Sequence, residues 1–500
     1  MSAFLLLRRT AIASLTASLL AACAVGPDYR APEALAASAY TEKPQPERTA
    51  AAAVAGGEAQ RFEVGARISA EWWTLFGSSD LDRLMQTALS GHPTLAAAQA
   101  ALRQAEENLN AQYAVLYPSV DASLSARRQR INGASFGNPA IPSSVFNLYN
   151  ASVNVSYAID VAGGARRELE ALQAGIDFQR FQLEAAYLSL TANIATTAFR
   201  EASLREQIRA TREIVEAQDR QLQLAEKQFA LGAISRADVL AQRAQLAQTR
   251  ANLPPLEKAL AQTRSQLAVL VGKFPSEAGL PQLDLAAFRL PETLPVSLPS
   301  DLLRQRPDIR AAEAILHQTN ARIGVAQALM FPQLTLSGSF GSASTSTSNL
   351  FDPGTQIWNI GAGLLQPIFH AGQLQARKRG AVAAYDQAFA QYQQVVLGAF
   401  QNVADVLSAL EFDAVALKAQ AEAEAAARES LEVTRMQLQF GAANYVVLLN
   451  AQRQYEQAKI GLVQAQAARY ADTAALFQAL GGGWWKRDGQ AGDVSPAPVN

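Results

Sequence analysis

ASVNVSYAIDV, residues 151–161, is the stretch of the chain that decides the fold. Apolar residues at every second position alternate with mostly polar ones, which is typical of a strand with one apolar and one polar face. A tilted strand needs roughly 9–11 residues to cross a bilayer, and this stretch has that length. The pattern predicts a membrane-crossing strand, although a strand of a soluble sandwich would show the same alternation.

Three other stretches alternate in a similar way: residues 119–128, 333–341 and, less regularly, 356–369. The segments 129–145 and 342–355 are rich in Gly, Ser, Thr, Asn and Pro, as loops are. We expect the four strands to form two hairpins with external loops. We expect no other strand in the 500 residues.

The remaining sequence contains very long stretches that nothing breaks. Residues 143–253 and 368–495 contain no proline, so residues 165–230 are predicted to form one helix of roughly 100 Å, at 1.5 Å per residue. Apolar residues recur at intervals of seven, which indicates coiled-coil packing. Glu201 and Glu424 interrupt this spacing. The spaced residues are Ile194, Ile208, Val215, Leu222 and Phe229 in the first half, and Val396, Val403, Leu410, Leu417, Leu431 and Leu438 in the second.

The chain repeats one pattern twice. Pro93 aligns with Pro307 at an offset of 214, and Gly232 aligns with Gly441 at an offset of 209, with matching neighbours around each pair. Each half is predicted to run helix, strand hairpin, very long helix, tight turn and returning helix. The predicted divisions are an N-terminal segment 23–79, repeats 80–272 and 300–481, a Pro-rich linker 273–299 and a tail 482–500.

Two tight turns are predicted to reverse the chain at the ends of the long helices. Gly232 and Gly441 are placed to take the left-handed conformation that ends a helix. Ser235, with Asp238 three residues on, and Asn444 are placed as the following N-caps. Capping alone would explain these residues, but blunt tips with small residues would also offer a docking surface to helices of another protein.

The first residues resemble an export signal. Arg8 and Arg9 precede a short apolar run, and the sequence LAAC at residues 20–23 resembles a bacterial lipobox. This resemblance implies a lipoprotein signal peptide over 1–22, acylation of Cys23 and a lipid-anchored N-terminal segment. Ala24, in place of an Asp, would favour the outer membrane. A plain signal peptide with an incidental cysteine is the alternative.

Composition excludes several classes of function. The chain has 43 Lys and Arg against 44 Asp and Glu, a balance that argues against a nucleic-acid-binding face. With 3 His and 1 Cys, neither a Cys/His zinc site nor an internal disulfide is possible. We find no nucleophile with a nearby base and no phosphate-binding Gly loop, so we expect no enzyme and no cofactor. His317 and His370 are expected to be packing or surface residues, and the GGGWW sequence at 481–485 is expected to be a chain end rather than a site.

No segment beyond the signal offers 18 consecutive apolar residues, so no transmembrane helix is expected. A chain that crosses a membrane without such a helix must do so as a closed barrel. Four strands are too few, because about eight form the smallest barrel. The chain is therefore expected to assemble with other copies.

Together these features resemble the outer-membrane factors of bacterial efflux pumps, the TolC-like family, and within it the OprM/NodT-type lipoproteins. The resemblance covers roughly residues 23–485. The matching segments are CAVGPDY at 23–29, Trp72-Trp73, Tyr157–Val161, Gln366–Phe369, Gly232–Arg243 and Gly441–Arg453.

The resemblance implies a mainly α fold with a β-barrel part. Three copies would form a 12-stranded outer-membrane barrel continued by a 12-helix periplasmic α-barrel. The homotrimer would be a passive conduit of a Gram-negative tripartite efflux pump, joined at its tips by a periplasmic adaptor to an inner-membrane pump of the RND type. We expect small amphiphilic compounds as cargo. A duct for metal ions or proteins, and a periplasmic coiled-coil structural lipoprotein, are the alternatives.

The resemblance also places a gate just after the second tip. Relatives commonly carry an Asp nine residues after the tip glycine, where this chain has Asn450. We expect the constriction at Val446, Val447 and Asn450, held more by packing than by charge and less selective for cations. The alternative is that these three residues only pack the second hairpin.

Overall fold

The computed structural model describes residues 24–33, 39–66, 68–132, 134, 137, 140 and 142–486. The predicted signal peptide 1–22, the predicted lipidation site Cys23 and the end of the predicted tail, 487–500, lie outside the described residues. The chain divides into two compact units, and both predicted repeats contribute to each. Within the described residues, unit 1 contains 24–32, 101–179 and 311–392, and unit 2 contains 33–100, 180–310 and 393–486.

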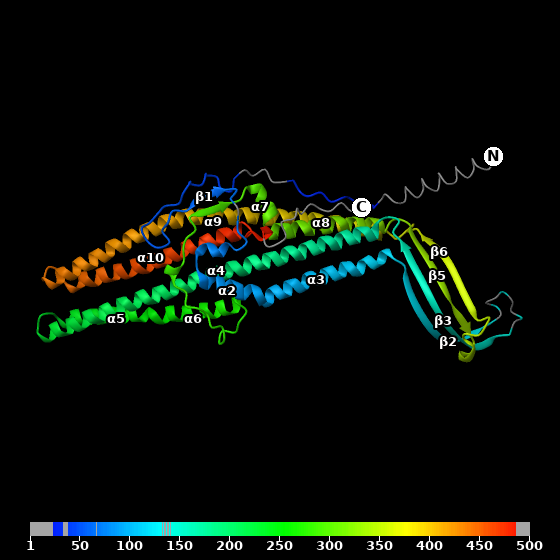
Figure 1. Ribbon diagram of the computed structural model, residues 1–500, viewed down its shortest axis with the longest axis horizontal. Coiled ribbons are helices and arrows are strands. Elements are labelled where there is room, and N and C mark those ends of the chain that lie inside the picture. The colour runs from blue at the N-terminus through cyan, green and yellow to red at the C-terminus, as the bar shows by residue number, and fades with distance from the viewer. Residues whose placement is uncertain are drawn as a thin grey trace. The chain divides into compact units, whose positions relative to one another are not determined.

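The order of the main elements runs twice along the chain (Figure 1). Each run contains a helix, two strands, a helix of 67 residues and a returning helical segment. The first run is α3 (Pro93–Tyr113), β2 (Ser119–Ile131), β3 (Ser144–Ile159), α4 (Gly164–Ala230), α5 (Arg236–Ala251) and α6 (Leu253–Leu270). The second is α8 (Pro307–Ala328), β5 (Gln333–Ser344), β6 (Gln356–Leu365), α9 (Gln373–Gln439) and α10 (Tyr445–Ala479). The single long helix predicted over 165–230 is confirmed.

Shorter elements connect these runs. They are β1 (Arg61–Val64), α2 (Ser79–Gly91), β4 (Thr293–Val296), α7 (Pro299–Gln305) and 3₁₀ turns at Trp72–Phe76, Ala114–Leu116, Leu285–Ala287, Thr347–Asn349 and Trp484–Lys486. β1 and β4 pair in parallel, so the expectation of only four strands was wrong. Four residues are too few to show an alternation, and Pro295 lies inside β4.

The four predicted strands exist, with different ends. β2 and β3 extend into the predicted loop 129–145, and β5 extends to Ser344. β6 stops at Leu365, four residues short of its predicted end, because Pro367 follows and proline cannot donate to a strand ladder. The loops are therefore shorter than the sequence pattern indicated.

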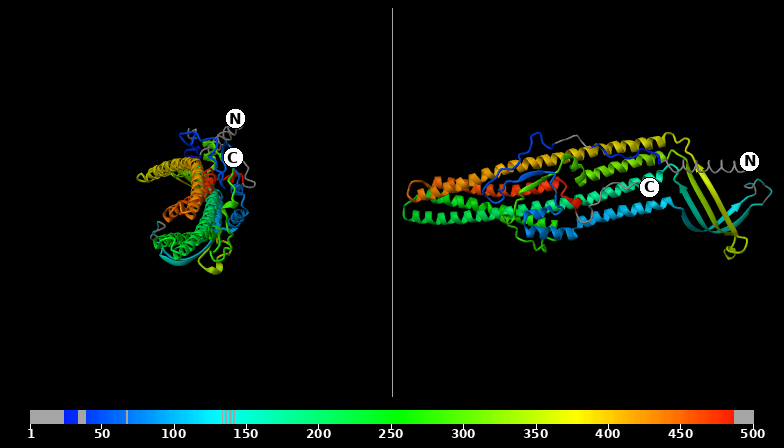
Figure 2. Two further views of the ribbon diagram at one scale, coloured as in Figure 1. Left: turned by 90° about the vertical axis from the view of Figure 1, so that its left-hand side faces the viewer. Right: turned by 45° about the horizontal axis from the view of Figure 1, so that its top comes forward.

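Unit 1 contains an antiparallel sheet in the order β2-β3-β5-β6, and Figure 2 shows that it is curved. The register is continuous, so cross-strand neighbours share a face. One face is polar, where Ser123 and Ser152 hydroxyls lie 3.0 Å apart and the Asn154 amide donates to Ser123. The other face is apolar and exposed. It carries Val120, Leu124, Val153, Val155, Leu336, Phe340, Trp358, Ile360 and Leu364.

The N-terminal segment packs closely on unit 1. The amide of Val25 donates to the Ala162 carbonyl, 3.0 Å away. A Cβ on Gly26 would lie 2.5 Å from the Cα of Gly324, so this contact requires both glycines. The buried Arg167 donates to Asp28 at 2.6 Å. Residues 25–28 are thus held beside the start of α4.

His317 is a packing residue, as expected. Its ring stacks on Tyr29 with centroids 4.2 Å apart, and Nε2 lies 3.0 Å from Glu170 Oε1. The carboxylate of Glu170 also accepts from Arg167 at 2.7 Å. Although burial opposes the charge, these two hydrogen bonds hold the pKa of Glu170 below its usual value.

Unit 2 contains an aromatic core. Trp72 stacks on Phe477 with ring centroids 5.4 Å apart. Phe76, Phe199 and Tyr470 pack beside them with their rings tilted or edge to face. The GGGWW sequence covers this core, because Trp484 is buried and its Nε1 donates to Gln305 O at 2.7 Å. The sequence that was expected to be a chain end therefore packs against the core of unit 2.

α9 is the one described helix that is long and apolar enough, on average, to cross a membrane, although it has no run of eighteen consecutive apolar residues. It contains an 18-residue window with a mean hydropathy of 1.3, because isolated Gln and Asp residues are diluted by Ala, Val and Leu. The expectation that no helix is apolar enough was therefore too strict. Length and composition alone are weak evidence of a span, since core helices of soluble proteins pass the same test.

Candidate functional site: the tips of the helical hairpins

The first tip joins α4 to α5. Gly232 has φ +73°, and its amide donates to Phe229 O while the next amide, of Ala233, donates to Gln228 O. These two bonds form the Schellman motif that closes a helix at a left-handed residue. Ser235 then caps α5, and Asp238 completes a capping box with bonds of 3.2 and 3.1 Å. The predicted caps of this turn are confirmed.

The second tip joins α9 to α10 by the same closure. Gly441 has φ +76°, and the amide of Ala442 donates to Gln437 O at 2.8 Å. Asn444 caps α10 by accepting from the amide of Val447 at 3.0 Å. Val447 stands at the repeat position of Asp238, so this tip has the N-cap without the reciprocal carboxylate.

Both tips lie at the same end of the long helices (Figure 1), and within unit 2 they share one hydrophobic core. The Tyr445 hydroxyl donates to Gln228 Oε1 at 2.5 Å, and Arg453 Nε donates to Gln245 Oε1 at 2.7 Å. Burial raises the pKa of Tyr445, and the charge of Asp238 adds to this. The shared core is formed by Leu222, Ala225, Val239, Leu246, Leu431, Tyr445, Leu448 and Ala451.

Each tip also exposes a large apolar side chain just before its glycine. Leu231 and Phe440 are each 85% exposed. They stand one residue before Gly232 and Gly441, so the duplication preserves an apolar residue at the point of each tip. The small residues of the tips could be recognised in the sequence, whereas this exposed apolar pair was not predicted.

The three predicted gate residues lie on one face of α10. Val446, Val447 and Asn450 are exposed, whereas Tyr445 and Leu448 are buried in the tip core. A helix places residues i, i+1 and i+4 on one side, so these side chains adjoin one another. Their role as a gate stays a prediction.

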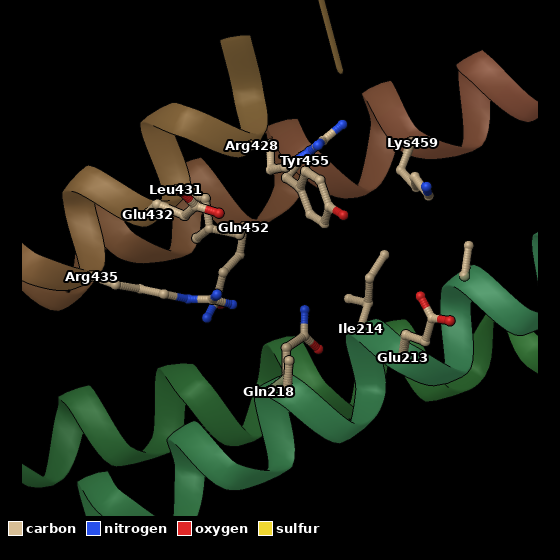
Figure 3. Close-up of a pocket in the computed structure, with 12 residues that line it drawn as sticks. Glu213, Ile214, Gln218, Arg428, Leu431, Glu432, Arg435, Gln452, Tyr455 and Lys459 are labelled. Carbon is tan, nitrogen blue, oxygen red and sulfur yellow. The ribbon is translucent and has the colours of Figure 1, made fainter. Parts of the chain in front are cut away.

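A polar cavity of about 220 Å³ lies between α4, α9 and α10 (Figure 3). Gln218 and Gln452 line it, each 3% exposed and each with side-chain polar atoms that have no protein partner. Buried amides without partners are usually satisfied by water. Glu424, which interrupts the heptad spacing, is buried beside this cavity and pairs with Arg428. The other lining residues are Ala210, Glu213, Ile214, Ala217, Leu431, Glu432, Arg435, Tyr455 and Lys459.

Two carboxyl groups form a further polar cluster, on α9 and α10. Asp472 is hydrogen bonded to Asp413, and burial, that bond and the Asp413 charge raise the pKa of Asp472 to about 8. The buried Arg469 is near both, with Nη2 donating to Glu58 O at 3.0 Å and to Gln60 Oε1 at 2.9 Å. Burial lowers the pKa of Arg469. Nothing in the sequence marked this cluster.

The Asp413–Asp472 pair predicts a stability that falls as the pH rises from about 4 to about 8. The pKa of Asp472 is about 8 in the folded chain, above its ordinary value of 3.8, so the folded chain holds a proton that the unfolded chain releases. This contribution is complete below pH 3.8 and is lost as pH rises to about 8. We expect Asp472→Asn to remove this dependence and to be more stable than the wild type above pH 8. Unfolding midpoints of the detergent-solubilised protein from pH 5 to 9 test it, and an unchanged slope in the variant would contradict it.

Among the described residues, no group of three or more His, Cys, Asp or Glu side chains could hold a metal ion. The chain has two helical hairpins whose tips share a hydrophobic core, and a sheet with one apolar face. These features define a class of proteins that combine long helices with an amphipathic sheet. The model of the family described as outer membrane efflux protein matches residues 84–273 and 298–482. The chain belongs to this family, which consists of outer-membrane channel proteins rather than enzymes.

Individual relatives agree with this assignment. The chain is 32% identical to the pyoverdine export outer membrane protein OpmQ of Pseudomonas aeruginosa, over 83% of this chain and 87% of that protein. It is 30% identical to the antibiotic efflux pump outer membrane protein ArpC of Pseudomonas putida, over 96% of each. Among solved structures, the outer-membrane channel OprN matches with a TM-score of 0.83 at 28% identity, over 92% of this chain and 100% of that chain.

Proposed function

We propose that the chain is one third of a trimeric outer-membrane conduit, the exit duct of a tripartite efflux pump. The amphipathic sheet carries this proposal. One whole face is apolar and exposed, and within the described residues the outer edges of β2 and β6 have no strand partner. An unpaired strand edge cannot face lipid, because its amides and carbonyls would have no hydrogen-bond partner there.

In an assembly of three copies, the unpaired backbone groups on the outer edges of β2 and β6 would all find hydrogen-bond partners. Pairing β2 of one copy with β6 of the next would give a closed barrel of twelve strands, with the apolar face toward lipid and the polar face toward the lumen. The long helices would form the periplasmic part below it. An anchor at Cys23 fits this arrangement, because the segment that follows is held beside the start of α4.

The tips would meet a periplasmic adaptor protein, which joins the conduit to an inner-membrane pump of the RND type. Leu231 and Phe440 support this, since exposed apolar side chains at the points of two joined tips suit the groove of a partner helix. We propose small amphiphilic compounds as cargo. The names of ArpC and OpmQ refer to antibiotic efflux and pyoverdine export, which favours this class. A duct for cations or proteins is the competing outcome.

Deleting the gene tests this function. The deletion strain is expected to become more susceptible to amphiphilic drugs, and the wild-type gene to restore resistance. A gene with Leu231→Asp and Phe440→Asp is expected not to restore it, although both side chains are exposed enough for the trimer to remain. Val269→Asp, at an exposed position on α6, is the control and should restore resistance. A wild-type protein that migrates as a monomer, heated or unheated, would favour the structural-lipoprotein alternative.

The gate is proposed at Val446, Val447 and Asn450, where the neutral amide would give weak cation preference. Asn450→Asp is expected to raise that preference, because three copies would add a ring of three carboxylates at the narrowest point. Single-channel recordings in asymmetric salt measure this as a shift in reversal potential. Ala241→Asp, at the equivalent position of the first tip, adds the same charge elsewhere and should leave the selectivity unchanged. Equal shifts in both variants would place the gate outside the second tip.

A further inference from the structure

Basic residues gather at one end of the sheet. The only charged residues within the four strands of unit 1 are Asp121, Arg127, Arg128 and Arg130, all on β2. The three arginines stand at the end of β2 that leads into the loop to β3, away from α3. The strand therefore carries its positive charge at its loop end.

Two of these arginines share the apolar face. The register of β2 with β3 is continuous from Ser119 to Ile131, so side chains alternate without a bulge. Arg128 and Arg130 therefore stand on the side of Val120 and Leu124, and Arg127 stands on the polar side. Arg128 is exposed, and Arg130 Nη2 donates to Ser143 Oγ at 2.9 Å.

Arg128 and Arg130 lie at the level along β2 where the apolar belt of a membrane barrel would end. From Val120 to Arg128 the strand is roughly 27 Å long, at about 3.4 Å per residue. Tilted by about 40°, as barrel strands are, it would rise by about 21 Å, which is most of the apolar band of about 25 Å. Tyr149, on the same face, pairs with Ala126 just below the arginines, at the level where aromatic side chains mark the interface. A guanidinium at this level reaches lipid headgroups without entering the hydrocarbon.

We propose that Arg128 and Arg130 bind the phosphate groups of the glycolipid in the outer leaflet. This rests on the proposed function, which places the loop end of the sheet outside. Guanidinium groups bind phosphate oxygens through paired, charge-assisted hydrogen bonds. Two arginines on alternate positions of one strand stand about 7 Å apart, a spacing that suits two phosphates of one headgroup or of neighbours.

The test uses the purified trimer in detergent and bisphosphorylated lipid A as the probe. We expect the lipid to raise the unfolding temperature of the wild type and to bind on the order of tenfold more weakly for each guanidinium removed, in Arg128→Gln, Arg130→Gln and the double variant. Arg127→Gln changes the same charge on the opposite face and should bind as the wild type does.

The controls separate the possible failures. Dephosphorylated lipid A should have little effect, and phosphatidylglycerol should bind more weakly. Equal stabilisation by phosphatidylglycerol, or an equal loss in Arg127→Gln, would overturn the proposal. Trimer size is measured before lipid is added. A monomeric wild type would contradict the proposed function, whereas a trimer that ignores lipid A would contradict only this inference.

Discussion

Ile360→Lys is expected to abolish the trimer in the outer membrane. Ile360 is 83% exposed on the apolar face of β6, midway along that strand, and its cross-strand neighbour on β5 is Gly338. A lysine facing lipid near the bilayer midplane costs about 2–4 kcal/mol. Every copy would incur this cost, and a closed barrel cannot form without all of its copies.

The control for this change is the next residue along the strand. Asn359→Lys places the same charge on the polar face, beside Ser339, where water would fill the lumen. Migration of unheated and heated outer-membrane extracts measures the result: a heat-sensitive trimer band should persist in Asn359→Lys and vanish in Ile360→Lys. Loss of the band in both variants, or in neither, would contradict the assignment of the two faces.

Local patterns predicted the parts of the fold that local forces determine. The two tips could be read from the sequence because Gly232 and Ser235 act through the backbone of their own neighbours. The strand 151–161 could be read because alternation along one strand already separates the two faces. β2 continues three residues past its predicted end at 128, because Gln129 and Arg130 resemble the start of a polar loop until the partner strand is known.

Contacts between segments far apart in the sequence leave no local pattern from which they could be predicted. β1 and β4 pair across more than two hundred residues, and a four-residue strand has no period to detect. The same holds for the cavity in unit 2, where Gln218 and Gln452 look like ordinary residues of a water-facing helix. Which face of a Gln-rich helix is buried depends on the helices beside it.

Glu201 is a further residue whose burial depends on neighbouring segments, and its substitution is expected to have a large effect on stability. It interrupts the heptad spacing of α4, yet it is fully buried. Oε1 accepts from Arg205 at 2.7 Å and from Arg264 at 2.8 Å, and Oε2 accepts from the amide of Leu283 at 3.2 Å. One carboxylate therefore joins α4 to α6 and to the loop after it, a role that no spacing within α4 could reveal.

We expect Glu201→Ala to destabilise the protein by about 3–5 kcal/mol, the usual cost of removing one partner from a buried charge network. Both arginines are about one-third exposed and can regain some water, which favours the lower end of the range. Glu257→Ala breaks an ion pair of similar length, 2.7 Å to Arg212, at the surface, and should cost about 0–1 kcal/mol. Denaturant midpoints of the detergent-solubilised protein measure both. Equal midpoints in the two variants would show that the buried network of Glu201 contributes no more to stability than the exposed Glu257–Arg212 pair.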